Sequence, residues 1–141
     1  MSTVEAVDLA QGQDFSRTLL KHTSIRVSDD YLDAFRSHVE AVHYAEGEVI
    51  FHKGDESDFA ILLASGEVEV YDEGSGTVLA VSGEGTLIGE LGMISGDPRS
   101  ASARALTPVR GWKIDRSDYR EFLSDRPELA TLFFRKIYAQ L

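Results

Sequence analysis

Residues 46–71 read EGEVIFHKGDESDFAILLASGEVEVY, and this part of the chain is typical of short β-strands. Two apolar runs, 48–52 and 59–64, have the length of strands, and each ends at a glycine-containing turn signal. A third run, 67–71, alternates polar and apolar side chains, as a strand with one buried face does. Three such runs in succession indicate a β-rich unit.

Further strands are expected on the C-terminal side. The loop 72–76, DEGSG, is rich in residues that tolerate positive φ, so it predicts a hairpin between 67–71 and a returning strand at 77–81. Two more strands are expected at 102–106 and 109–114, on either side of a Thr107-Pro108 turn. Many short strands with turn signals at this spacing predict an antiparallel sandwich or jelly roll.

Helical patterns flank the strand region. On the N-terminal side, Ser28 is expected to cap a helix whose apolar stripe consists of Leu32, Phe35, Val39 and Val42. On the C-terminal side, one helix is expected after Asp115, and Pro127 opens another. The apolar residues of this last helix form a wide stripe of Leu129, Leu132, Phe133, Phe134, Ile137, Tyr138 and Leu141. A stripe this wide predicts docking against the roll or against a second copy of the chain.

The composition sets limits on the class of protein. A chain of 141 residues with 43% hydrophobic and 27% charged residues fits one soluble globular domain. No apolar run reaches the roughly 18 residues that cross a membrane, and the N-terminus has no signal-peptide pattern, so a cytoplasmic location without membrane insertion is expected. The absence of cysteine excludes disulfides and thiolate sites. A net charge of −10 argues against binding nucleic acid.

Residues 89–101, GELGMISGDPRSA, carry the strongest functional signal. A carboxylate at Glu90 and a guanidinium at Arg99 flank a segment long enough for one or two helical turns, which Gly96-Asp97-Pro98 closes. The small residues Ser100 and Ala101 follow, so backbone N–H groups can approach a ligand closely. A forked cation, amides at a helix start and a nearby acceptor suit a sugar phosphate. Taken singly, each element also fits an ordinary turn with a solvated arginine, outside the core.

With the glycine-spaced sequence before it, this segment resembles the phosphate-binding cassette of cyclic-nucleotide-binding domains, the family of the catabolite activator protein and the kinase A regulatory subunits. The resemblance runs from about Val42 to Leu141. It implies an α+β fold. Together with the polar N-terminal sequence, this predicts a polar leader with a short helix at 1–27, followed by a domain at 28–141. That domain would consist of an N-terminal helix, an antiparallel β-roll of about eight strands at 43–115 and C-terminal hinge helices at 116–141.

The resemblance also implies roles for individual residues. Arg99 would clamp the exocyclic phosphate, amides near Ser100 and Ala101 would add donors, and Glu90 would accept from the ribose 2′-OH. Gly89 would let the backbone approach the sugar, with Leu91 beside it.

Two further positions concern the base. Val70 and Leu79 fall where family members line the base pocket, although plain core packing explains them equally well. In the family a threonine after the arginine often favours guanine, so the resemblance with Ser100 at this position implies cyclic AMP as the ligand, with cyclic GMP possible.

Other functions fit the sequence less well. The spacing Gly83-Glu84-Gly85 to Gly89 is one residue too long for a dinucleotide fingerprint, and no GxSxG elbow is present. The four histidines have no metal-binding spacing, so neither a metal nor an enzymatic role is expected. The function predicted is a regulatory domain that signals nucleotide occupancy through its C-terminal helices, to a second copy or a larger effector. A degenerate roll that serves only as an interaction module is the alternative.

Overall fold

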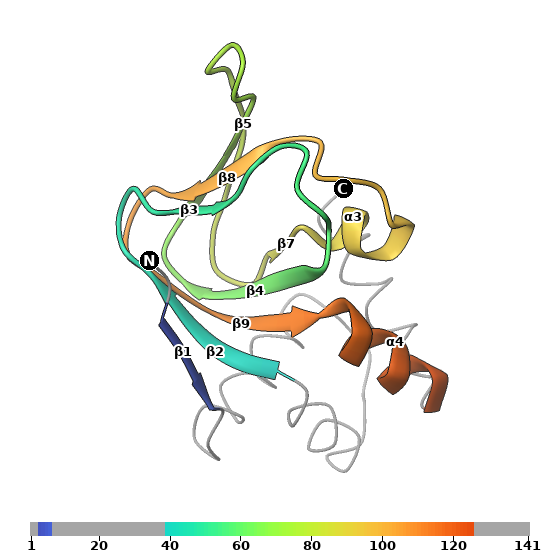
Figure 1. Cartoon of the computed structure of the whole chain (residues 1–141). Coiled ribbons are helices and arrows are strands. Elements are labelled where there is room, and N and C mark those ends of the chain that lie inside the picture. The colour runs from blue at the N-terminus through green and yellow to red at the C-terminus, as the bar shows by residue number, and fades with distance from the viewer. Residues whose placement is uncertain (1–2, 7–38, 126–141) are drawn as a thin grey trace.

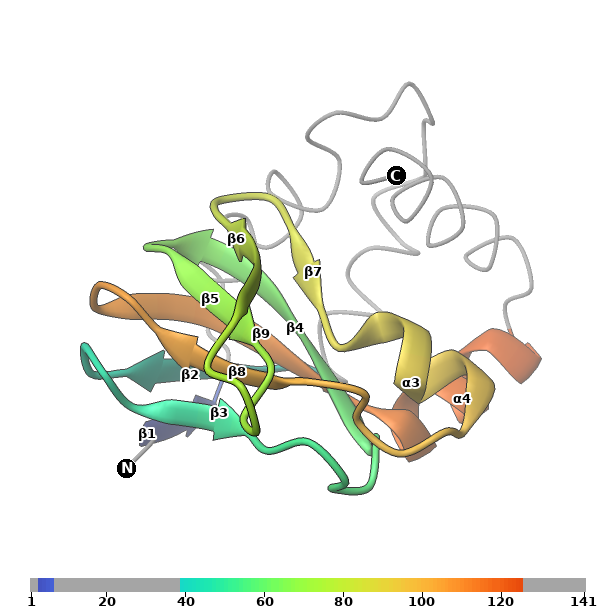
Figure 2. The same ribbon diagram turned by 90° about the horizontal axis from the view of Figure 1, so that it is seen from above.

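The structure, a computed structural model, describes residues 3–6 and 39–125 of the 141-residue chain. Its strands form two antiparallel sheets that face each other as a roll (Figures 1 and 2). One sheet has the order β1 (Thr3–Ala6), β2 (Val39–Tyr44), β9 (Val109–Asp115), β4 (Phe59–Ser65) and β7 (Leu87–Ile88). The other has the order β3 (Val49–Phe51), β8 (Ser102–Ala105), β5 (Val68–Tyr71) and β6 (Val78–Ser82).

The predicted β-roll is confirmed. Eight of the nine strands formed by the described residues lie between positions 39 and 115. Each of the six runs that the sequence predicts as strands overlaps one strand of the roll, with ends that agree to within one residue. The two-residue strand β7 was not expected, because a pair of apolar residues before a glycine gives no periodicity to read.

Two predictions about the N-terminal part of the chain are wrong. Residues Thr3–Ala6 form β1, which pairs with β2, where a polar leader was expected. Val39 and Val42 lie in β2 and not on a helix. Their spacing suits a helix, but a strand that is buried on both faces also has apolar residues at both odd and even positions. The predicted helix between 28 and 38 lies outside the described residues.

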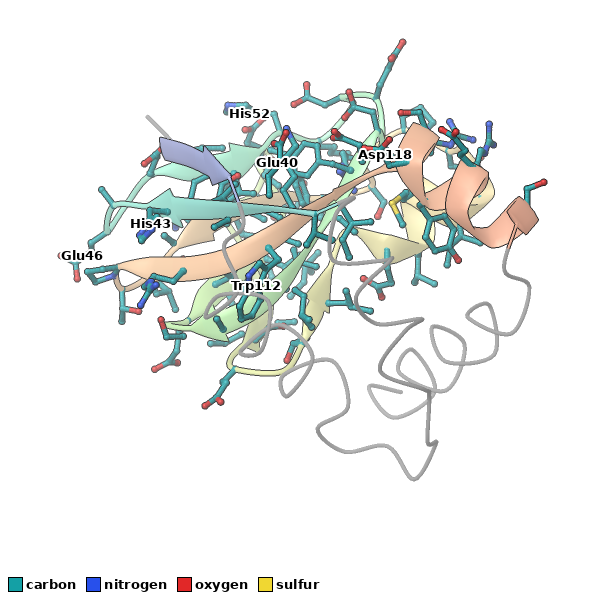
Figure 3. All side chains as sticks on the ribbon, turned by 90° about the horizontal axis from the view of Figure 1, so that it is seen from below. Glu40, His43, Glu46, His52, Trp112 and Asp118 are labelled. Carbon is teal, nitrogen blue, oxygen red and sulfur yellow. The ribbon has the colours of Figure 1, made fainter. Side chains whose placement is uncertain are left out.

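The core lies between the two sheets. From the five-stranded sheet it receives Val42, Tyr44, Ile61, Leu63, Ile88 and Val109, and from the four-stranded sheet Phe51, Val68, Ala103 and Ala105. The opposite face of the five-stranded sheet is apolar as well. There Trp112, labelled in Figure 3, is paired in register with Ala41 on β2 and Leu62 on β4, and all three are buried.

Two helices are described. Helix α3 (Glu90–Ser95) forms the helical turns predicted within the cassette, and α4 (Arg116–Asp125) begins directly after β9, as predicted. The second C-terminal helix and its apolar stripe lie outside the described residues. No helix in the described part of the chain has the length and apolar character needed to cross a membrane.

Candidate functional site

A cavity of about 490 Å³ lies between α3 with its following loop on one side and strands β5 and β6 on the other. Seven of the eight site residues predicted from the sequence line it: Val70, Gly89, Glu90, Leu91, Arg99, Ser100 and Ala101. Val70, which lies 19 or more positions before the other six, therefore shares one cavity with them. Its size is that of a small-molecule site.

Leu79 does not line the cavity. It is 58% exposed, whereas Ala80 and Ser82 on the same strand line the cavity. Val70 pairs with Ala80 but Tyr71 pairs with Val78, so the register shifts and Leu79 is the additional residue of a bulge. A bulge changes the face on which a side chain lies, and therefore the sequence prediction for Leu79 is wrong.

The side chain of Arg99 is buried at the edge of the core, with 5% of its surface exposed. Its Nη1 donates to the carbonyl oxygen of Gly89 at 2.8 Å and its Nη2 to that of Phe59 at 2.5 Å. The guanidinium carbon lies 4.1 Å from the ring centroid of Phe51 and 4.8 Å from that of Phe59. The expectation that this side chain lies outside the core is wrong, since two aromatic rings and two carbonyls hold it in place.

Two hydrogen bonds also hold the backbone of Arg99. Its N–H donates to the Asp55 carbonyl and its own carbonyl accepts from the Gly54 N–H, both at 2.8 Å. Burial lowers the pKa of Arg99, and the carboxylates of Asp58, Asp55 and Glu90 oppose that shift. An arginine so placed remains a cation.

Gly89 makes room for this guanidinium. Its φ of 82° lies in the left-handed region, and a Cβ at this position would overlap Nη1 of Arg99. Glycine is the residue that satisfies both requirements. The role of Gly89 in the structure is therefore to admit the arginine.

The guanidinium keeps unused donors. Of its five N–H groups, two are accounted for by the carbonyls of Gly89 and Phe59. Among the described residues, Nε of Arg99 has no hydrogen-bond partner although it is buried. Because Arg99 also lines the cavity, its guanidinium gives the cavity wall a positive charge. The site therefore fits a phosphate group.

Glu90 adds an acceptor beside this cation. It is the first residue of α3, it is buried, and it lines the cavity with Arg99. Ser57, which the sequence analysis missed, is also buried against the cavity, and its Oγ donates to the Asp97 carbonyl at 2.6 Å. This bond ties the loop before β4 to the loop after α3.

Other lining residues also escaped the sequence analysis. Ala80 and Ser82 lie on the strand that contains Leu79, so a strand-period reading of both faces could have found them. Phe51 and Ser57 carry no local signal, because only the tertiary fold brings them to the cavity. Within the described residues, no group of histidine and carboxylate side chains could hold a metal ion.

Fold and site together define a β-roll that encloses a small-ligand cavity with a buried cation in its wall. The model of the cyclic nucleotide-binding domain family matches residues 41–126, which is more than half of the chain. This protein belongs to the cyclic nucleotide-binding domain family.

The chain is also similar in sequence to individual curated proteins. The chain is 36% identical over 102 residues to a cAMP-dependent protein kinase regulatory subunit of Dictyostelium discoideum, covering 70% of this chain and 30% of that protein. It is 27% identical over 118 residues to the CRP-like cAMP-activated global transcriptional regulator of Mycobacterium tuberculosis, covering 82% of this chain and 53% of that protein.

The chain is similar to a solved structure as well. The N-terminal domain of a transcriptional regulator from Streptomyces coelicolor A3(2) superposes with a TM-score of 0.71 at 30% identity, with 90% of this chain and 89% of that chain covered. The protein is thus a cyclic nucleotide-binding regulatory domain, and it spans about half or less of the curated relatives' lengths.

Proposed function

We propose that this domain binds cyclic AMP in the cavity beside α3 and that Arg99 holds the exocyclic phosphate. The observation that carries the proposal is the guanidinium of Arg99, which lines the cavity and is held in place by two carbonyls and two phenylalanine rings. The protein carries a net charge of −10, so an anionic ligand needs a local cation, and Arg99 lies in the wall of this cavity.

The other lining residues fit the remaining parts of a nucleotide. Glu90 accepts a hydrogen bond from the ribose 2′-OH, and backbone amides near Ser100 and Ala101 add donors to the phosphate. Val70 with its cross-strand partner Ala80 forms an apolar wall for the base. Leu91 lines the cavity while 60% exposed, so it contacts the ligand at the cavity's mouth.

Cyclic AMP is favoured over cyclic GMP for two reasons. Both curated relatives described above carry cAMP in their names. In addition, Ser100 follows the arginine at the position where a threonine often favours guanine in this family.

Occupancy is transmitted through the residues after β9. The N–H of Arg116, the first residue of α4, donates to the Asp58 carbonyl at 2.8 Å, and the next carbonyl, that of Phe59, accepts from Arg99. Asp58 and Phe59 are consecutive residues. A ligand that displaces the Arg99 side chain therefore acts one residue away from the carbonyl that holds the first residue of α4. The domain is regulatory and not catalytic, it does not bind nucleic acid, and its partner is a second copy or a larger effector.

Calorimetric titration tests the binding step. Cyclic AMP is expected to bind at one site per chain, cyclic GMP more weakly, and linear 5′-AMP weakest because it lacks the cyclic diester. If neither cyclic nucleotide binds, the roll is an interaction module and the proposal fails.

Hydrogen exchange over residues 116–125 tests the transmission step. We expect their protection to change when cyclic AMP is added, together with a change in sedimentation if the partner is a second copy. Unchanged protection and unchanged mass would remove the switch.

A further inference from the structure

Two exposed ion pairs join the loop between β5 and β6 to the loop after β3. The imidazole Nδ1 of His52 contacts Oε1 of Glu73, and Nζ of Lys53 lies 3.6 Å from Oδ1 of Asp72. Figure 1 shows the β5–β6 hairpin projecting beyond the rest of the roll. The two pairs therefore tie a projecting hairpin to the body of the domain.

The loop after β3 also holds Arg99. The N–H of His52 donates to Oδ2 of Asp55 at 3.0 Å, and the Asp55 N–H donates back to the His52 carbonyl at 3.1 Å. This closed turn presents the Asp55 carbonyl and the Gly54 N–H to the backbone of Arg99. Gly54 and Asp55 of this turn thus hold the backbone of Arg99, while His52, its first residue, contacts the hairpin.

The hairpin carries the opposite wall of the cavity. The pair Val70 and Ala80, which lines the cavity, lies one step from the hairpin end, where Tyr71 pairs with Val78. β6 is the edge strand of its sheet, so a movement of the loop that contains Glu73 reaches the Ala80 side of this wall through β6.

We propose that His52 is a positioning residue of the ligand site: its ion pair with Glu73 holds the β5–β6 wall against the Arg99 wall, so that nucleotide affinity depends on the protonation of His52. This inference rests on the proposed function. A ligand that touches both walls binds best when their separation is already fixed.

The surroundings of His52 set the direction of the effect. Its pKa is raised, first by the hydrogen bond to Glu73, which outweighs the opposing desolvation, and then by the charges of Glu73 and Asp55. The pKa of Glu73 is lowered, chiefly by His52 and also by the Ser102 hydroxyl, so this carboxylate is ionised throughout the neutral range. The pKa of the neighbouring Asp72 is lowered, chiefly by the hydrogen bond from the Ser75 hydroxyl.

The ion pair is complete below the ordinary histidine pKa of about 6.5 and is lost as the pH rises through the raised value. Both side chains are about half exposed, so the effect is modest. We expect the affinity for cyclic AMP to fall about two- to fivefold between pH about 6 and pH about 8.5.

Calorimetric titration with cyclic AMP across this range tests the inference in the wild type, His52→Gln, Glu73→Gln and His43→Gln. The wild type and His43→Gln should lose affinity as the pH rises, whereas His52→Gln and Glu73→Gln should bind equally at both ends of the range. His43 lies on β2, at a separate place on the roll (Figure 3), and therefore controls for the loss of a histidine. A pH dependence that survives in His52→Gln overturns the inference, as does a wild type without pH dependence.

A readout without ligand separates this inference from the proposed function. Amide hydrogen exchange at pH about 6 should be faster over residues 70–80 in His52→Gln than in the wild type. In NMR titrations the His52 pKa should fall in Glu73→Gln and should rise further when cyclic AMP is added, because the coupling of proton and ligand is reciprocal. If the wild type binds no cyclic nucleotide, the proposed function fails. In that case, equal exchange rates in His52→Gln and the wild type also refute the proposed role of the ion pair, whereas faster exchange in His52→Gln supports it.

Discussion

Replacing Arg99 by alanine should abolish most nucleotide binding and also destabilise the fold. The second effect follows from the structure, since the guanidinium is 5% exposed, lies against two phenylalanine rings and donates to two carbonyls. Alanine leaves the carbonyls of Gly89 and Phe59 without this donor. We expect a loss of about 1–3 kcal/mol in the free energy of unfolding.

The loss of binding should be larger. Removing one partner of a desolvated, charged contact costs about 2–5 kcal/mol, which is roughly a 30-fold to several-thousand-fold loss of affinity. Arg99→Lys keeps the charge but cannot donate to both carbonyls and to a phosphate from one planar fork, so it should recover only part of the affinity.

Arg104→Ala is the matched control. Arg104 also lies over an aromatic ring, 4.3 Å from the Tyr71 centroid, and donates from Nε to Glu69 at 2.8 Å, but it does not line the cavity. Urea unfolding gives the stability of each variant, and calorimetry at a temperature where all are folded gives the affinity. If folded Arg99→Ala binds cyclic AMP within about threefold of Arg104→Ala, the assignment of the phosphate to Arg99 is wrong.

Three further outcomes are expected. Gly89→Ala should reduce affinity by about tenfold or more, because its Cβ enters the space of the arginine guanidinium, whereas Gly83→Ala, whose Cβ meets no atom within 4 Å, should bind as the wild type does in calorimetry. Ser57→Ala removes the 2.6 Å bond to Asp97 and should lower the free energy of unfolding by about 1 kcal/mol in urea titrations, with the exposed Ser117→Ala unchanged. Gel shifts at low salt should show no DNA complex, because the net charge is −10; a salt-sensitive complex would contradict this.

Much of the roll could be predicted from sequence because its strands are short, alternate in polarity and end at glycine turns. The runs 59–64 and 67–71 became β4 and β5 almost residue for residue. The cassette could be predicted for the same reason, since its helix begins and ends at glycines with φ of 82° and 84°. Local preferences set these features, and local preferences can be read from one sequence.

The features that could not be predicted depend on tertiary contacts. The face on which Leu79 lies depends on a one-residue shift in the pairing of β5 with β6, and no residue type in the hairpin announces that shift. Val39 and Val42 have a helical spacing but lie in a strand with both faces buried. The burial of Arg99 depends on Phe51 and Phe59, two residues that only the fold brings to it.

That burial changes how the site works. A solvated arginine would need its side chain ordered by each ligand that arrives, which costs entropy at every binding event. Here Gly89 and Phe59 hold two of the five donors before any ligand binds, and the rings of Phe51 and Phe59 fix the plane of the guanidinium. The ordering cost is therefore met during folding, and the remaining N–H groups are already oriented. In a protein with a net charge of −10, such a preformed cation offsets the repulsion that an anionic ligand meets on approach.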